Sequence, residues 1–124
     1  MTKFLLIGLG GFLGAILRYT ISTYIQAWTQ NSDYPYGTLA VNISGCLLIG
    51  LGSQLAANHQ WFTPELRFLI LVGFLGAFTT FSTYSNEGVG LFQDDRMAAA
   101  FLYIGGSVIL GLCAVWVGQR LAGQ

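Results

Sequence analysis

Four long apolar segments occupy most of the 124-residue sequence and restrict what the chain can fold into. An apolar stretch of about 20 residues is long enough to cross a lipid bilayer as an α-helix. Hydrophobic residues make up 54% of the chain and charged residues only 8%, which is unlike a soluble domain. We therefore predict an all-α integral membrane protein, a single domain over residues 1–124 with four transmembrane helices at about 4–28, 38–57, 65–87 and 97–120.

The polar residues argue against several classes of function. The formal net charge is zero and there is no basic run, so nucleic acid is not an expected partner. The sequence has no Cys/His or Ser/His pairing, no HExxH motif and no glycine loop followed by lysine, so we do not expect an enzyme. Cys46 and Cys113 are predicted to be buried free thiols, and His59 a solvated loop residue.

Residues 73–87 read GFLGAFTTFSTYSNE and carry a nearly continuous run of small polar side chains inside the third apolar segment. Such side chains are costly where a helix faces lipid. One interpretation is a buried helix whose hydroxyls bond to their own carbonyls four residues earlier, which accounts for one or two of them. We favour a polar pathway or an ion site, because it accounts for the whole run. The run comprises Thr79, Thr80, Ser82, Thr83, Ser85 and Asn86.

The same segment contains residues that weaken a helix near the middle of the membrane. These are Gly73, Gly76 and the adjacent pair Thr79 and Thr80. We predict that the third helix is broken there. Carbonyl groups exposed by a break must find partners inside the protein, and a dehydrated cation is one good partner.

Isolated polar residues in the other segments are candidates for the same site. Asn42 lies inside the second segment, where its amide must bond another helix, bind water or coordinate an anion. Tyr103, Ser107 and Gly111 share one helix face, which indicates either a polar track or a packing seam. Arg18 lies within the first segment, where it either reaches the membrane interface or lines an anion vestibule.

Glycine spacing and charge placement bear on assembly. Gly10 and Gly14 form a GxxxG pair, which allows the backbone of another helix to approach closely. The basic residues give only a weak orientation bias, so we hypothesise that the protein inserts in both orientations and forms an antiparallel dimer. Four short helices also cannot enclose a pore alone. The basic residues are Lys3, Arg67 and Arg120 on the side of both termini and Arg18 and Arg96 on the other.

Three stretches of the sequence resemble the signature segments of one family, the small bacterial fluoride channels of the Fluc (CrcB-type) family. They are GGFLGAILR at 10–18, GTLAVNISG at 37–45 and GFLGAFTTFSTYSNE at 73–87, and the TTFST core is the most specific part. The likeness covers essentially the whole chain. It implies a passive fluoride exporter in the bacterial inner (cytoplasmic) membrane, working as an antiparallel homodimer with two pores at the interface.

The resemblance also implies roles for individual residues of the fluoride pore. Phe81 matches the first of two paired phenylalanines whose ring edges contact the ion. Tyr84 stands where the family usually has the second, and its added hydroxyl either donates to the anion or narrows the path. Asn42 matches the pore asparagine, with Thr80 and Ser82 as further candidate donors.

Other matched positions lie beyond these donors. Tyr103 and Ser107 resemble the start of a polar track on the fourth helix, and Gly111 stands where another hydroxyl would extend it. Gly76 and Thr79 match positions whose backbone carbonyls hold a structural sodium ion at the dimer centre. The remaining two matches, Arg18 and Glu87, lie near the pore mouths.

The chemistry of the residues agrees with a fluoride pathway. A small, strongly hydrated anion needs amide, hydroxyl and ring-edge donors in place of its water, without a charge that would trap it. A small proton-coupled drug exporter is an alternative, but it needs a buried carboxylate early in the chain, whereas Glu87 lies at a helix end. A non-transporting membrane assembly subunit is a second alternative, and it leaves the hydroxyl run unexplained.

Overall fold

The computed structural model describes residues 1–30 and 33–123, and over these residues the chain is helical with no β-strand. The helices are α1 (Thr2–Trp28), α2 (Tyr36–Asn58), α3 (Pro64–Leu66), the π-helical η1 (Arg67–Leu75), α4 (Gly76–Phe78), α5 (Phe81–Gln93) and α6 (Met97–Ala122). The segment α3 to α5 forms one interrupted rod, so the described residues make four long helical spans.

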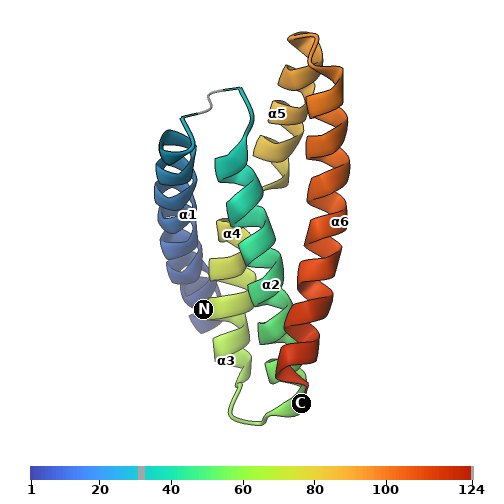
Figure 1. Ribbon diagram of the computed structural model, residues 1–124. Coiled ribbons are helices and arrows are strands. Elements are labelled where there is room, and N and C mark those ends of the chain that lie inside the picture. Colours follow the sequence, from blue (N-terminus) through green and yellow to red (C-terminus); the bar gives the residue numbers. More distant parts are fainter. Residues whose placement is uncertain (31–32, 124) are drawn as a thin grey trace.

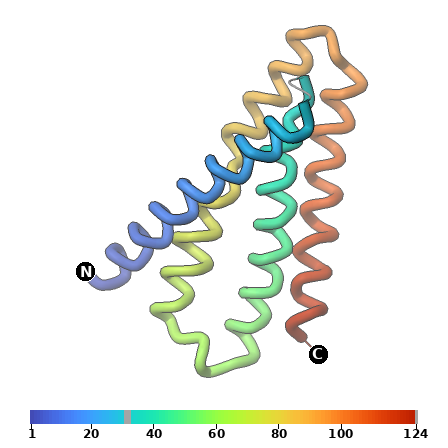
Figure 2. The backbone as a smooth tube through the Cα atoms, turned by 60° about the vertical axis from the view of Figure 1, so that its left-hand side comes forward, coloured from blue at the N-terminus to red at the C-terminus, as the bar shows by residue number. Residues whose placement is uncertain are grey.

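Each span is long and apolar enough to cross a membrane: Thr2–Trp28, Tyr36–Asn58, Pro64–Gln93 and Met97–Ala122. The predicted all-helical chain with four long apolar helices is therefore confirmed. The spans lie side by side in an elongated bundle (Figure 1). Figure 2 shows α1 running obliquely across the others.

Glycines set the close contacts between the spans. A Cβ atom added to Gly10 would lie 2.1 Å from the Leu69 carbonyl oxygen, and one added to Gly14 would lie 2.1 Å from that of Phe74. The GxxxG pair of α1 thus lies directly against the backbone of η1. Because a backbone atom cannot move aside as a flexible side chain can, only glycine fits these two positions.

The helices α2 and α6 pack in the same way. A Cβ atom on Gly50 would lie 2.2 Å from the Val115 carbonyl oxygen, and one on Gly118 would lie 2.3 Å from that of Leu47. Large apolar side chains instead cover the outside of the bundle, where Phe12 is 64% exposed. This surface suits lipid, because a membrane protein buries its small residues between helices and shows its apolar ones to the bilayer.

The third span corrects one predicted boundary. The sequence placed its end at Glu87, but α5 continues to Gln93. Gly88 and Leu91 are buried in this added part, and Gly88 faces Ile104 of α6. The packing against α6 keeps the chain helical through residues that looked like a loop, so the connection to α6 shortens to residues 94–96.

The cysteines correct another expectation. Cys46 and Cys113 are free, but Cys113 is exposed and Cys46 is only partly buried. Cys113 lies on the apolar outer surface, which in a membrane protein faces lipid and is not part of a core. His59 is exposed in the loop between α2 and α3, as predicted, with its ring 5.9 Å from that of Trp61.

Candidate functional site

The third span is interrupted at Thr79 and Thr80. The backbone is extended there, with φ −89° and ψ 158° at Thr79 and φ −146° and ψ 119° at Thr80. Thr80 then caps α5, because its Oγ1 accepts a hydrogen bond from the Thr83 N–H at 3.2 Å. Threonine is a favourable residue at a helix N-terminus for this reason. The Thr80 hydroxyl therefore stabilises the N-terminus of α5.

Asn42 of α2 clamps the interruption. Its Nδ2 donates to the Thr80 carbonyl at 3.1 Å, and its Oδ1 accepts from the Thr80 N–H at 2.8 Å. An asparagine amide nitrogen carries two hydrogens, so one donor of Asn42 remains beyond this pair of bonds. Asn42 thus satisfies an extended backbone inside the bundle, in addition to its predicted place in a polar pathway.

The same bonds release two backbone carbonyls from their helical donors. In a continuous α-helix the Gly76 carbonyl would accept from the Thr80 N–H, and the Thr79 carbonyl from the Thr83 N–H. Here the first donor bonds Asn42 and the second bonds the Thr80 side chain. These are the two carbonyls that the family resemblance implied for a cation, and their helical donors are taken by side chains.

Two neighbouring carbonyls are satisfied within the protein. The Leu75 carbonyl accepts from both the N–H and the hydroxyl of Thr79, each at 3.2 Å. The Ala77 carbonyl accepts from Arg18 Nε at 3.1 Å. Arg18 therefore reaches inward to the interruption. Within the polar run at 79–86, the Thr79 hydroxyl bonds to a carbonyl four residues earlier, as the buried-helix interpretation predicts.

A cavity of about 400 Å³ opens beside the interruption. None of the residues that line it is charged. Its lining brings together most of the predicted pore and cation residues from α2, the third span and α6: Asn42, Gly76, Thr79, Thr80, Phe81, Tyr84 and Ser107. We call it the interruption cavity. It joins amide, hydroxyl and aromatic groups that are far apart in the sequence.

The two aromatic residues of the interruption cavity lie one helical turn apart on α5. The ring centroids of Phe81 and Tyr84 are 5.7 Å apart and their planes are tilted by 39°. Phe81 is 79% exposed, so most of its ring is open to the surroundings of a single chain. The Tyr84 hydroxyl donates to the Ile104 carbonyl at 3.0 Å, which turns it toward the backbone of α6.

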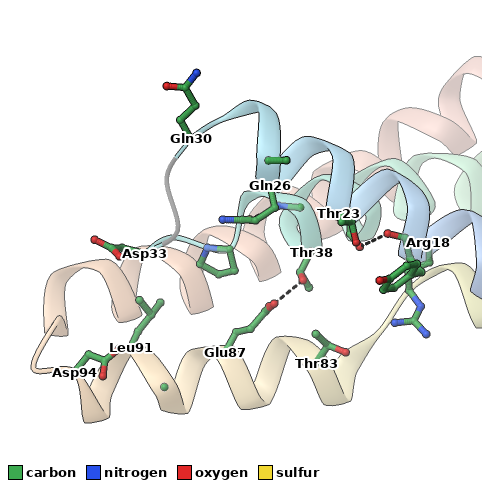
Figure 3. A pocket seen from close by; sticks show the side chains of 16 residues that line it. Arg18, Thr23, Gln26, Gln30, Asp33, Thr38, Thr83, Glu87, Leu91 and Asp94 are labelled. Carbon is green, nitrogen blue, oxygen red and sulfur yellow. Dashed lines mark hydrogen bonds between the residues drawn. The ribbon is translucent and has the colours of Figure 1, made fainter.

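A second, larger cavity of about 940 Å³ lies on the loop side of the interruption (Figure 3). Arg18, Thr38, Thr83 and Glu87 are among its lining residues. The Glu87 carboxylate accepts from the Thr38 hydroxyl at 2.7 Å and from the fully buried Tyr103 hydroxyl at 2.7 Å. Glu87 is therefore held between α2 and α6.

Two predicted site residues lie outside the interruption cavity, and a third residue near the site was not predicted. Tyr103 does not line the interruption cavity with Ser107, because its hydroxyl is directed to Glu87. Ser82 is exposed, lines neither of the two cavities and lies 3.4 Å from the Thr80 hydroxyl. Thr38 was not among the predicted site residues, although it precedes Asn42 by four residues and so shares its helix face.

The sequence matches a known protein family over nearly its whole length. The family model described as "CrcB-like protein, Camphor Resistance (CrcB)" matches residues 5–119. A protein of Acidobacterium capsulatum named "Fluoride-specific ion channel FluC" is 44% identical over 117 residues, which covers 94% of this chain and 93% of that protein. A protein of the same name from Flavobacterium psychrophilum is 44% identical over 94% of this chain and 93% of its own length. One from Nitratidesulfovibrio vulgaris is 43% identical over 98% and 97%.

Proposed function

Because this chain belongs to the CrcB-like protein family, we propose that it is a fluoride-selective ion channel, which lets fluoride leave the bacterial cell passively. It is a multi-pass bacterial membrane protein and not an enzyme, since its family consists of ion channels. The observation that carries the proposal is the interruption cavity, which collects neutral hydrogen-bond donors and has no charged residue in its lining.

The neutral lining suits a small anion that must pass through quickly. Fluoride gives up its water only where other donors replace that water. The second amide hydrogen of Asn42, the Ser107 hydroxyl and the positive ring edges of Phe81 and Tyr84 supply such donors at the cavity. A lysine or arginine in the same place would bind the anion too strongly for rapid release, and Arg18 is instead bonded to the Ala77 carbonyl.

We propose that a second copy of the chain closes the cavity. The exposed ring of Phe81 leaves the fluoride path open on one side in a single chain. In an antiparallel homodimer the partner would cover this side and create two pores at the interface. The basic residues support opposite orientations, because they are split almost evenly between the two sides of the membrane. Lys3, Arg67 and Arg120 lie on the side of the chain termini, and Arg18 and Arg96 lie on the other side.

The released carbonyls fit a sodium ion at the centre of this dimer. Gly76 and Thr79 would hold it through backbone oxygens, since their helical donors are occupied by Asn42 and Thr80. Hard cations such as sodium bind oxygen ligands, and two copies would double the number of carbonyls. Bound there, sodium would offset the carbonyl dipoles that the interruption leaves at mid-membrane.

The direct test is ion efflux from liposomes that contain the purified protein. Fluoride and chloride electrodes would follow release after a potassium ionophore is added to carry the counter-charge. We expect rapid fluoride release that requires the ionophore, with little chloride release. Protein-free liposomes provide the background. Equal release of both anions would contradict selectivity, and no fluoride release from folded protein would contradict the proposed function.

The same assay separates the two alternatives that the sequence left open. A proton-coupled drug exporter would not release fluoride in response to a potassium ionophore alone. A membrane assembly subunit would release neither anion. We do not propose either function, because the relatives of this chain carry the name of an ion channel.

A further inference from the structure

Tyr84 links two helices at the interruption cavity. Its hydroxyl donates to the backbone carbonyl of Ile104 at 3.0 Å, and this bond runs from α5 to α6. The ring itself stays in the cavity lining beside Phe81. The hydroxyl is therefore engaged with protein, while the ring remains available to the cavity.

Gly88 makes this link possible. It lies four residues after Tyr84, so the two residues share one face of α5. Gly88 is buried, and a Cβ atom added there would lie 3.2 Å from the side chain of Ile104. The absence of a side chain at Gly88 brings α6 close to α5, where the phenol of Tyr84 reaches the α6 backbone.

Ser107 follows Ile104 by one helical turn and also lines the interruption cavity. Serine hydroxyls inside helices usually donate to a carbonyl three or four residues earlier. Ser44 and Ser53 of α2 do so, with Ser44 lying 2.8 Å from the Ala40 carbonyl and 3.1 Å from that of Val41. Within 1–30 and 33–123, the Ser107 hydroxyl is the buried side-chain polar atom that has no hydrogen-bond partner.

The Tyr84 bond explains this difference through a shared acceptor. Ile104 precedes Ser107 by three residues, which is the place that Val41 holds relative to Ser44. A carbonyl oxygen has two lone pairs. The α-helix directs one of them to the Val108 N–H, and the Tyr84 hydroxyl takes the other. Ser107 is thereby denied one of its two acceptors within α6, and its hydroxyl does not bond the other one, the Tyr103 carbonyl, either.

We propose that Tyr84 is a positioning residue for anion passage: its hydroxyl occupies the Ile104 carbonyl and so keeps the Ser107 hydroxyl free to donate into the interruption cavity. The inference rests on the proposed function, because fluoride is the anion that would receive this bond. The Tyr84 hydroxyl acts through Ser107 and does not touch the ion.

A double-mutant cycle tests this coupling. Single-channel fluoride currents would be recorded in planar bilayers for the wild type, Tyr84→Phe, Ser107→Ala and the double variant. We expect each single variant to conduct with a current lowered roughly three- to tenfold, the factor expected for one net hydrogen bond. We expect the double variant to conduct as well as Ser107→Ala alone, because the first change has already withdrawn the Ser107 donor.

Two further variants separate positioning from a general structural effect. Replacing Tyr84 by 4-aminophenylalanine keeps a donor at the same place, so it should restore the current. Tyr24→Phe removes the hydroxyl of a tyrosine that is 72% exposed on α1 and should leave the current unchanged. The fluoride concentration that gives half-maximal current should rise in both Tyr84→Phe and Ser107→Ala, since each loses the same donor to the ion.

The outcomes distinguish this inference from the proposed function. Wild-type fluoride current with additive losses in the double variant would overturn the coupling and leave the channel function intact. An unchanged current in Tyr84→Phe would do the same. No fluoride current in the wild type would overturn the proposed function and, with it, the inference.

Discussion

The side chain of Asn42 and the backbone of Thr80 form a reciprocal pair of hydrogen bonds, at 3.1 Å and 2.8 Å, across the point where the third span is interrupted. Thirty-eight residues separate the two partners in the chain. The pair holds the extended backbone at Thr80 against α2 and frees the Gly76 carbonyl from its helical donor. Fold and site are therefore linked through one amide group.

We expect Asn42→Ala to destabilise the protein and stop fluoride efflux. It would leave the Thr80 N–H and carbonyl without the two bonds described above, and each unsatisfied buried group costs about 1–3 kcal/mol. The melting temperature in detergent and liposome efflux would measure both effects. Ser53→Ala, which removes a back-bonded hydroxyl from the same helix, is the matched control. Similar melting temperatures for the two variants would contradict a clamp at Asn42.

Phe81→Ile should lower fluoride efflux without changing the oligomeric state. The substitution keeps most of the apolar volume and removes the aromatic ring edge that faces the open side of the interruption cavity. Efflux and size-exclusion chromatography would be compared with Phe12→Ile, a change at a 64% exposed phenylalanine of α1. If both variants conduct like the wild type, the Phe81 ring does not contact the ion.

Glu87→Gln should retain ionophore-dependent fluoride efflux. The carboxylate accepts from two hydroxyls, and a glutamine can keep one of these bonds and donate in the other. A proton-coupled exporter would lose transport with this change, because it would lose its titratable group. Efflux driven with and without a pH gradient would show the difference. Complete loss of flux in a folded variant would favour the exporter.

The pair Gly10 and Gly8 offers a sharp test of helix packing on α1. Gly10→Ala would place a Cβ atom 2.1 Å from the Leu69 carbonyl oxygen, whereas Gly8 has no neighbour within 4 Å. Gly10→Ala should therefore lower the melting temperature strongly or prevent folding. Gly8→Ala should leave it unchanged or raise it slightly, since alanine favours a helix by about 1 kcal/mol. Equal effects would show that α1 does not pack closely on η1.

Sodium should stabilise the dimer if the Gly76 and Thr79 carbonyls hold it. The melting temperature should rise with sodium concentration and rise less with N-methylglucamine at equal ionic strength, because a ligand that binds the folded state stabilises it by mass action. The proposed ligands are backbone atoms, so Thr79→Ala should keep the sodium effect. A response that depends on ionic strength alone would argue against a sodium site.

Much of the fold follows from local properties that the sequence displays. The lengths of the apolar segments predicted four helical spans, and the GxxxG spacing predicted that the backbone of another helix packs closely on Gly10 and Gly14. The structure identifies that helix as the third span. The end of the third span at Gln93 was not predictable in this way. Glycines and polar residues after Glu87 resemble a loop, and only their burial against α6 keeps them helical.

Most of the predicted site residues line the interruption cavity, whereas their individual contacts were not predictable from the sequence. Side-chain chemistry and spacing identified Asn42 and Ser107, because polar groups in apolar helices need a reason to be there, and the family resemblance added Phe81 and Tyr84. Which atom each group bonds depends on how distant helices approach one another.

The sequence by itself determined that this chain is a four-span membrane protein of the CrcB-like family, since hydrophobic length and family motifs are properties of consecutive residues. Only the tertiary structure decided that Asn42 binds Thr80, that Glu87 lies between Thr38 and Tyr103, and that Tyr84 donates to Ile104. The physical reason is that a hydrogen bond is short and directional. Its partners are set by the close approach of helices, which glycine contacts spread along the whole chain produce together.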